Sequence, residues 1–305
     1  MGCDVAGTVI EVGSNVTRFK AGDRVLAFAT GMEEKHNTSV MGGYQLYTVV
    51  QENMASMIPD LLEFEMAAVV PLAMSTAACG LFERSQLALR HPAVGGNSEK
   101  IKEILILWGG STSVGCNAIQ LAVAAGYEVV TTCSPRNFDL VKSLGASAAF
   151  DYHSETLVED IVKECKGRLV AGAMSIGNGG AERCTDILGQ CKGNRFLSMV
   201  SYPNPANPDA SIPVRMWTFL SFLVRMWFKK RATGVRSKFV WGGSLEFNEV
   251  SKAVFEDYLP EALRRGQYIC APNAEIIGNE LESIQSGLDI LKKGAVSAKK
   301  LVVKF

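Results

Sequence analysis

The residues best suited to do chemistry are a run of glycines and hydroxyl side chains, GGSTSVG, at positions 109–115. Glycines let a backbone turn tightly and approach a phosphate closely, and the free N–H groups at the start of a following helix attract negative charge. An uninterrupted apolar run at 104–108 precedes the motif, and a helical pattern over 115–125 follows it. This order of buried strand, glycine turn and helix predicts a dinucleotide phosphate site at Gly110, Ser111, Thr112, Ser113 and Val114. Because Thr112 stands where the strict motif has a glycine, a glycine-rich turn that binds no nucleotide is the alternative.

The loop after the next expected strand, residues 128–132, indicates which nucleotide is bound. NAD sites place an Asp or Glu at the end of this strand to hold the ribose 2′-hydroxyl, whereas residues 131–137 read TTCSPRN, without a carboxylate. Ser134 and Asn137 can donate hydrogen bonds, and Arg136 can pair with a 2′-phosphate. We therefore expect NADP(H) as the cofactor, with a solvated surface charge as the alternative for Arg136. Tyr152 ends the third expected strand, where its ring either stacks on the adenine or is an ordinary tyrosine at the edge of the core.

The elements around these residues indicate an α/β fold. Continuous apolar strands alternate with helices from residue 104 onward, which predicts βαβ units and a doubly wound parallel sheet of the Rossmann type. The first part of the chain is rich in β-forming residues, with strands expected at 5–12, 25–28 and 44–50. We expect a β domain over 1–88, a nucleotide-binding domain over 89–270, and a return to the β domain over 271–305.

Composition narrows the class of protein. The chain has 305 residues and equal numbers of basic and acidic side chains, 31 of each, so there is no electrostatic reason to expect nucleic acid as a partner. The eight cysteines include no C-x-x-C pair, and the start of the sequence does not resemble a signal peptide, which together favour a cytoplasmic protein without a metal site. His36, His91 and His153 lie in polar, loop-like contexts and are expected at the surface. The apolar segment 214–228 is expected as a covered helix, a subunit contact, a substrate lid or an interfacial membrane helix.

The sequence resembles the medium-chain dehydrogenase/reductase family, in its zinc-free quinone-oxidoreductase and enoyl-reductase branch, and above all fungal trans-acting enoyl reductases. The resemblance covers nearly the whole chain and rests on GCDVAGTVIEVGSNVTRFKAGDRV, GGYQLYTVV, VVPLAMSTAACGLF, the stretch from WGGSTSVG to SAAFDY, and VSAKKLVVKF. It implies that the first part is a GroES-like domain. The family's chains begin well before the position that matches Met1, so the resemblance also implies an incomplete, N-terminally truncated GroES-like domain. The His–Glu pair and the four-cysteine cluster of the zinc-dependent branch have no counterpart in this sequence.

The resemblance implies a role for each matching residue. Ser111 to Val114 would contact the cofactor phosphates, Ser134, Arg136 and Asn137 the 2′-phosphate, and Tyr152 the adenosine end. Thr76 would lie beside the nicotinamide or the substrate, as the one candidate catalytic residue. The residues expected to flank the nicotinamide are Met199, Val200, Val296 and Ser297. Those expected to line the substrate side are Val240, Trp241, Gly242, Gly243 and Ser244.

The expected activity is the NADPH-dependent reduction of a C=C bond activated by a carbonyl, as in the enoyl reductases of polyketide and other secondary metabolism. A quinone or enone reductase that acts on small diffusible substrates is a second interpretation. A non-catalytic NADPH-binding protein is a third, since the β domain is expected to be incomplete. The substrate would be a small molecule or an acyl thioester, a polyketide synthase is a possible partner, and the chain would be a monomer or a homodimer. Tyr44, Tyr47, Thr76 and Ser297 remain open as proton donors.

Overall fold

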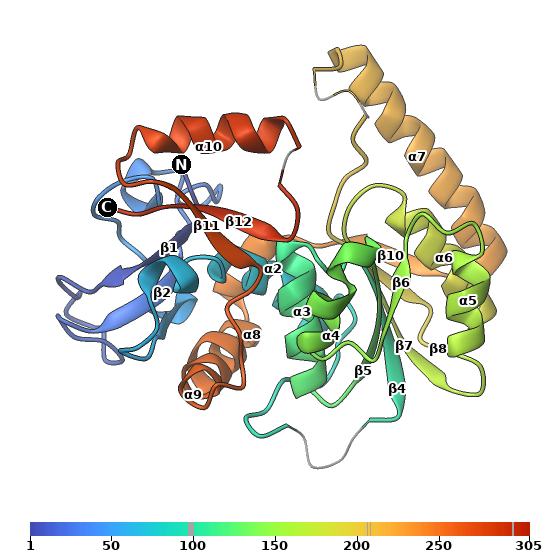
Figure 1. The fold of residues 1–305 in the computed structure, drawn as a ribbon, viewed down its shortest axis with the longest axis horizontal. Helices are drawn as coiled ribbons and strands as arrows, with labels where there is room; N and C mark the ends of the chain where they lie inside the picture. Colours follow the sequence, from blue (N-terminus) through green and yellow to red (C-terminus); the bar gives the residue numbers. More distant parts are fainter. Residues whose placement is uncertain (97–100, 206, 208, 295) are drawn as a thin grey trace.

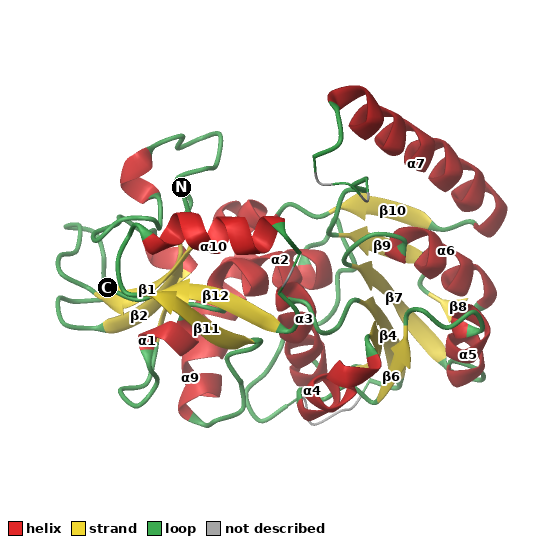
Figure 2. Cartoon of the chain, turned by 45° about the horizontal axis from the view of Figure 1, so that its top comes forward, coloured by secondary structure: helices red, strands yellow, loops and turns green. Residues whose placement is uncertain are grey.

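The computed structural model describes residues 1–96, 101–205, 207, 209–294 and 296–305. Figure 1 shows a β-rich part that contains both chain ends beside a larger part built on a parallel sheet. Helix α2 runs between the two parts, and helices α8 and α9 lie beneath the β-rich part (Figure 1). Figure 2 shows the same layers with the strands in yellow and the helices in red.

The sheet of the larger part is parallel throughout and has the strand order β10-β9-β7-β4-β5-β6, with the short β8 paired to β7. Its strands are β4 (Glu103–Trp108), β5 (Glu128–Cys133), β6 (Ala148–Asp151), β7 (Leu169–Ser175), β8 (Lys192–Gly193), β9 (Phe196–Met199) and β10 (Arg236–Phe239). The order turns outward in both directions from β4, as a doubly wound sheet requires. The predicted fold class, an α/β protein with a Rossmann-like sheet, is therefore confirmed.

Strand β4 shows why this sheet forms. Leu105 and Leu107 belong to a core cluster with α2 and α3, whereas Ile104 and Ile106 belong to another cluster with α5 and α6. Successive side chains of a strand point to opposite faces, so a strand that is apolar throughout is buried on both sides. The helices of this part are α2 (Pro71–Phe82), α3 (Ser113–Ala124), α4 (Phe138–Ser143), α5 (Leu157–Glu164), α6 (Gly180–Gln190) and α7 (Ile212–Thr233).

The β-rich part joins the two ends of the chain. Strands β1 (Asp4–Thr8), β2 (Arg24–Phe28) and β3 (Ala55–Met57) form an antiparallel sheet, and β11 (Asn273–Gly278) pairs in parallel with β12 (Lys299–Val303). The Nζ atom of Lys300 lies 2.7 Å from Oδ2 of Asp4, so the last strand is tied to the first. The remaining helices are α1 (Phe64–Ala67), α8 (Glu249–Ser251), the π-helix η5 (Lys252–Tyr258), α9 (Leu259–Arg264) and α10 (Ser283–Lys292).

The strand expected at 44–50 does not form, and that prediction was wrong. Tyr44 donates its backbone N–H to Met1 O and Val49 donates to Val40 O, so the segment bends between local partners and joins no ladder. Beside it lies a hollow of about 1300 Å³, lined by residues 40–52, β1, β12 and α10. A strand needs a partner for its N–H and C=O groups, and the described part of the chain offers none along this segment.

The apolar segment 214–228 forms most of the long helix α7, which projects at the upper right of Figure 1. Phe222 and Met226 are buried against the sheet part, while Trp217 and Trp227 are 73% and 61% exposed. Among the described residues, one helical stretch, Phe64–Phe82, has the length and hydropathy of a membrane span, and 67% of it is buried within the fold, as in a core helix.

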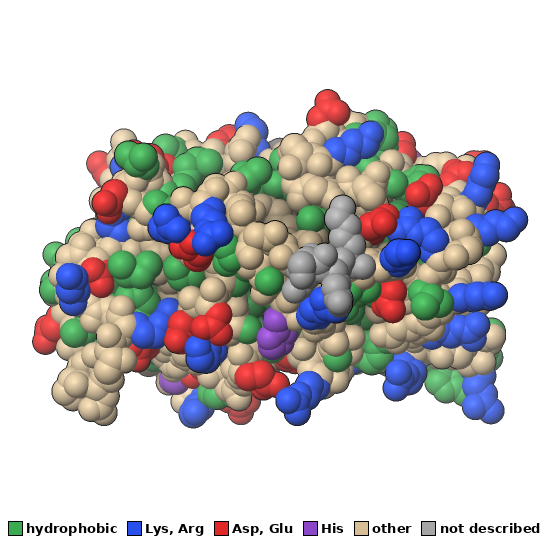
Figure 3. Space-filling view, turned by 90° about the horizontal axis from the view of Figure 1, so that it is seen from below, with side chains coloured by type: hydrophobic (Ala, Val, Ile, Leu, Met, Phe, Trp, Pro, Cys, Tyr) green, Lys and Arg blue, Asp and Glu red, His purple; other side chains and the backbone are tan. Residues whose placement is uncertain are grey.

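The surface agrees with the balanced charge of the sequence. Lys and Arg side chains are interspersed with Asp and Glu side chains across the face drawn in Figure 3. All eight cysteines are free thiols, and all but Cys3 are buried.

Candidate functional site

The glycine turn between β4 and α3 is packed so closely that larger residues do not fit. Gly109 has φ +87°, a backbone conformation that favours glycine. A Cβ atom on Gly110 would overlap the hydroxyl of Thr131, and one on Gly115 would overlap the carbonyl oxygen of Gly109. Thr131 is itself fixed, because its hydroxyl donates to Leu107 O at 2.8 Å. The turn is therefore a cradle of backbone atoms at the carboxyl end of the central strand.

Thr112, which departs from the strict glycine motif, has a structural role that the sequence did not reveal. Its side chain accepts the N–H of Gly115 at 3.0 Å and donates to Gly109 O at 2.8 Å, so it caps α3 and closes the turn. Ser113 and Val114 begin the helix, where N–H groups have no partner within the helix. These groups form the phosphate-binding geometry of a helix N-terminus, which fits the pyrophosphate of a dinucleotide.

The loop after β5 reaches back to this cradle. Asn137 is buried and donates from Nδ2 to Ser111 Oγ at 3.2 Å, while Ser134 Oγ donates to the Tyr152 hydroxyl at 3.4 Å. Arg136 is exposed on the same loop and has no hydrogen bond or ion pair with any described residue. Ser134 and Arg136 thus lie on a loop beside the cradle, where their polar groups fit a phosphorylated ribose, whereas Asn137 is engaged with Ser111; their roles at a 2′-phosphate stay predictions.

Tyr152 lies at the edge of this group, with one face of its ring on a neighbour. Its ring centroid is 4.0 Å from that of His153 and 6.4 Å from that of Trp108. Asp151, the last residue of β6, is a carboxylate that sequence reasoning overlooked here. Hydrogen bonding from the backbone N–H of His153 holds the pKa of Asp151 below its usual value, and the His153 ring adds to the effect. This carboxylate is thus already engaged beside the expected adenosine end.

Thr76 and its neighbour Ser75, both in α2, contact the segment 240–244. Thr76 is half-buried in α2 and donates its hydroxyl to Leu72 O at 2.9 Å. A Cβ atom on Gly242 would lie 2.6 Å from Thr76 Oγ1, and Ser75 Oγ donates to Gly242 O at 2.7 Å. The candidate catalytic residue therefore borders the segment that was expected to line the substrate side.

The other residues expected near the nicotinamide differ in burial and in the elements that carry them. Met199 ends β9 and is buried, and Val240 is attached to it by a backbone hydrogen bond of 2.8 Å to Met199 O. Val200, the residue after β9, is half-buried. Val296 is half-buried and Ser297 exposed in the link between α10 and β12, and no hydrogen bond within the described residues ties them to Thr76.

Two acidic residues, Glu33 and Glu83, accept hydrogen bonds from the segment 240–244, and the sequence did not single them out. Trp241 is 61% exposed and donates its indole N–H to Glu33 Oε2 at 2.9 Å. Ser244 donates its hydroxyl to Glu83 Oε1, which also accepts from Asn248 Nδ2 at 2.9 Å. Both carboxylates come from distant parts of the chain, so no local pattern could have identified them.

His36, which was expected at the surface, is partly buried in a polar cluster. Its Nε2 atom lies 2.6 Å from Glu246 Oε1, and Gln51 Nε2 donates to the same oxygen at 2.6 Å. The side chains of His36 and Glu246 are only 17% and 2% exposed. The second carboxylate oxygen, Glu246 Oε2, is buried without a hydrogen-bond partner among the described residues. A polar loop does not always lie at the surface, and this one folds onto Glu246, 210 positions away in the chain.

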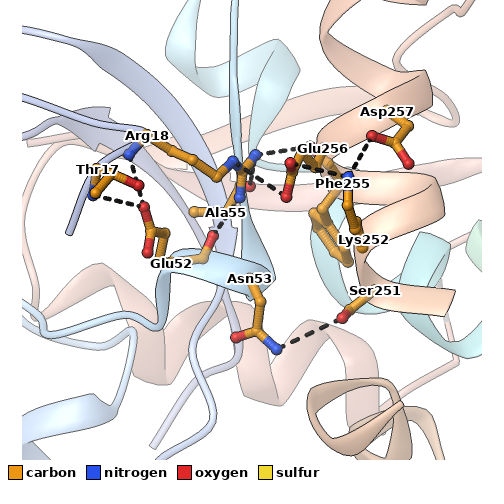
Figure 4. Close-up of polar contacts among 10 residues, drawn as sticks. All are labelled: Thr17, Arg18, Glu52, Asn53, Ala55, Ser251, Lys252, Phe255, Glu256 and Asp257. Carbon is orange, nitrogen blue, oxygen red and sulfur yellow. Dashed lines mark hydrogen bonds and ion pairs between the residues drawn. The ribbon is translucent and has the colours of Figure 1, made fainter. Parts of the chain in front are cut away.

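Figure 4 shows a second polar cluster, centred on Arg18, that joins the β-rich part to the π-helix. The guanidinium donates to Glu52 O at 2.7 Å and to Phe255 O at 3.4 Å, and it lies 3.5 Å from Glu256 Oε2. Glu52 in turn accepts the backbone N–H of Arg18 at 2.7 Å. These contacts tie the β-rich part to the π-helix that follows segment 240–244.

A parallel sheet with a glycine cradle at its switch point, next to a separate β-rich part, is the architecture expected of a two-domain dehydrogenase or reductase. Comparison with known proteins agrees. Residues 1–60 match the alcohol dehydrogenase GroES-like domain, and residues 113–187 match the zinc-binding dehydrogenase domain. The described residues contain no group of three or more His, Cys, Asp or Glu side chains placed to hold a metal ion.

The chain belongs to the medium-chain dehydrogenase/reductase family. It is 48% identical over 307 residues to the dehydrogenase pigH of Monascus ruber, covering 100% of this chain and 83% of that protein. It is 36% identical to the trans-enoyl reductase himH of Aspergillus japonicus, covering 100% of this chain and 80% of the relative. It is thus related to fungal dehydrogenases and trans-enoyl reductases.

Solved structures show the same fold at lower identity. The CurK enoyl reductase superposes with a TM-score of 0.67 at 18% identity, covering 99% of this chain and 78% of that one. The quinone oxidoreductase of Escherichia coli, solved in complex with NADPH, superposes with a TM-score of 0.65 at 22% identity, covering 99% and 82%.

Proposed function

We propose that this protein is an NADPH-dependent, zinc-independent reductase of C=C bonds activated by a carbonyl group. The observation that carries the proposal is the joining of the glycine cradle to the loop 134–137, through the hydrogen bond from Asn137 to Ser111. That loop presents Arg136 and has no carboxylate to repel a 2′-phosphate. The relationship to trans-enoyl reductases supports reduction of an enoyl group.

The chain's own residues would bind and orient the reactants. When bound, the reduced nicotinamide supplies the hydride for the carbon β to the carbonyl. Because the Thr76 hydroxyl donates its hydrogen bond to Leu72 O, its oxygen remains an acceptor for an amide or other donor beside Gly242. Met199 and Val240 are buried and apolar, so they would keep water away from the reacting atoms.

The proposed substrate is an acyl thioester, delivered by a polyketide synthase. The support for it is the relationship to proteins named trans-enoyl reductases, at 36% identity to one and 32% to two others. Reduction of quinones or small enones is the second candidate, supported by the shared fold with a quinone oxidoreductase. A protein that binds NADPH without turnover is the third.

The first experiment is a titration of the purified chain with NADPH and NADH, followed by tryptophan fluorescence. Saturable binding that favours NADPH would support the cofactor assignment. Oxidation of NADPH is then followed with a 2-enoyl thioester and, separately, with a quinone. Turnover of the thioester supports the proposal, turnover of the quinone alone supports the second candidate, and binding without turnover supports the third. Absence of binding to either nucleotide would refute all three.

A further inference from the structure

Two consecutive glycines face the candidate catalytic threonine and a carboxylate, one each. The Cβ position of Gly242 faces Thr76 Oγ1, and the Cβ position of Gly243 is already filled by the Glu33 carboxylate. Consecutive Cα atoms are about 3.8 Å apart, so Thr76 and Glu33 border neighbouring points of one short backbone segment. The missing side chains of the two glycines leave room for both groups.

Glu33 is held in this position from two sides. Its Oε2 atom accepts the indole N–H of Trp241, and its backbone carbonyl accepts the N–H groups of His36 and Asn37 at 2.9 and 2.8 Å. The His36 side chain anchors the same turn to the buried Glu246. A turn fixed at both its backbone and its side chains presents the carboxylate at a defined place.

The Glu33 carboxylate has no ion-pair partner among the residues that the structure describes. The nearest basic residue in sequence, Lys35, instead has its Nζ atom 4.5 Å from the centre of the Phe247 ring. Like charges repel, and the repulsion is stronger beside a half-buried carboxylate than between two ions in bulk water, so Glu33 disfavours a second negative charge that approaches it.

Trp241 supplies the apolar surface next to this charge. Its indole N–H is used by Glu33, while 61% of the residue is exposed. An indole ring presents a large, rigid, flat surface on which an acyl chain can pack. The segment thus combines a surface for carbon chains with a fixed negative charge.

We propose that Glu33 and Trp241 are specificity-determining residues that admit neutral acyl groups and exclude free carboxylic acids. Trp241 packs against the acyl chain, and Glu33 repels the carboxylate of an unesterified acid. This inference rests on the proposed function and specifies its substrate class: thioesters, esters and ketones are accepted, and the corresponding acid anions are not.

The test is equilibrium binding, which requires no turnover. The probes are the N-acetylcysteamine thioester of hexanoic acid and the hexanoate anion, titrated calorimetrically into the full chain with NADP+ present and absent. We expect the thioester to bind at least about tenfold more tightly than the anion, which corresponds to about 1.4 kcal/mol. Glu33→Gln should reduce this ratio to below about threefold, mainly by strengthening binding of the anion.

Matched variants separate the effect of the Glu33 charge from the effects of its position and of the Trp241 ring. Glu34→Gln removes the same charge one residue away, on an exposed side chain, and should leave the ratio unchanged. Gly243→Ala keeps the charge but displaces the Glu33 carboxylate, and should lower the ratio. Trp241→Ala should weaken binding of the thioester without improving that of the anion.

An unchanged ratio in Glu33→Gln, equal binding of both probes, or binding of neither probe to the unmodified chain would each overturn the inference. Turnover of an enoyl thioester is measured separately on the same preparations. Turnover without discrimination leaves the proposed function standing and removes this inference. Discrimination without turnover supports the assignment of Glu33 and Trp241 as ligand-selecting residues, but it leaves NADPH binding without turnover as the function.

Discussion

Removal of His36 should destabilise the protein far more than neutralising its partner does. The carboxylate of Glu246 is almost fully buried, and its Oε1 atom receives two hydrogen bonds while Oε2 receives none within the described residues. In His36→Ala, Gln51 would be the remaining donor to a buried negative charge. Breaking a buried pair in this way costs about 3–5 kcal/mol. Because the His36 side chain is 17% exposed, water can partly replace it, so we expect about 3 kcal/mol.

Glu246→Gln provides the comparison. The amide has nearly the same shape, carries no charge, and can still accept from Gln51 or bond to His36. We therefore expect a cost of about 1 kcal/mol or less. The free energy of unfolding is measured by urea titration at one fixed pH, with tryptophan fluorescence and circular dichroism as probes. His153→Ala is the control, because that imidazole is 65% exposed and its pairing with Asp151 is at the surface.

The reasoning would be refuted if His36→Ala were within about 1 kcal/mol of the unmodified protein, since the buried carboxylate would then need no partner. It would also be refuted if Glu246→Gln cost as much as His36→Ala, because the loss would then come from shape and not from charge.

Three further predictions address the cofactor site and the core. Arg136→Ala should weaken NADPH binding roughly tenfold or more and leave NADH unchanged, because a charge-assisted bond to phosphate contributes about 1.5–3 kcal/mol; fluorescence titration with both nucleotides checks this, and equal losses would contradict it. Gly115→Ala should abolish cofactor binding and lower the midpoint of urea unfolding, since its Cβ would overlap a backbone carbonyl. Gly13→Ala, whose Cβ would have its nearest neighbour at 3.9 Å, should change neither measurement. The stability of the protein should fall as the pH rises above 9, because burial raises the pKa of both Cys116 and Cys270 from 9.0 to about 12. Unfolded thiols ionise first, so each such thiol costs up to about 1.4 kcal/mol per pH unit in that range; urea titrations between pH 8 and about pH 10.5 test it, and a flat profile would exclude it.

Much of the parallel sheet could be predicted because its signals are local. The apolar run of β4, the glycine turn and the helix that follows are consecutive in sequence, and each specifies its own conformation. The segment 44–50 has the same β-forming character, yet it forms no strand, because a strand also requires a partner that local sequence does not reveal. For the same reason β11, whose partner β12 lies beyond a whole helix, was not anticipated.

In the candidate site, too, contacts within one βαβ unit could be predicted and contacts between distant residues could not. Ser111 and Asn137 could be placed together because a known motif specifies both ends of one βαβ unit. Glu33 and Trp241 are 208 positions apart, and the pair of His36 and Glu246 spans 210, so neither pair leaves a pattern in a single sequence. Trp241 was expected on the substrate side, but its partner could be found only in three dimensions.

The ties between the two ends of the chain also set an order of events during synthesis. The sheet from β4 to β10 is built from neighbouring βαβ units, so it can form while the ribosome is still adding the last residues. The β-rich part is completed later, because Asp4 can pair with Lys300, and Arg18 can donate to Phe255 O, only after those distant residues have been made. Such contacts between distant residues form slowly, since a long loop must close before they contribute any stability. Strands β1 to β3 are therefore synthesised before the parallel sheet but make their last contacts after it. Until then their apolar side chains can be bound by chaperones or by other chains.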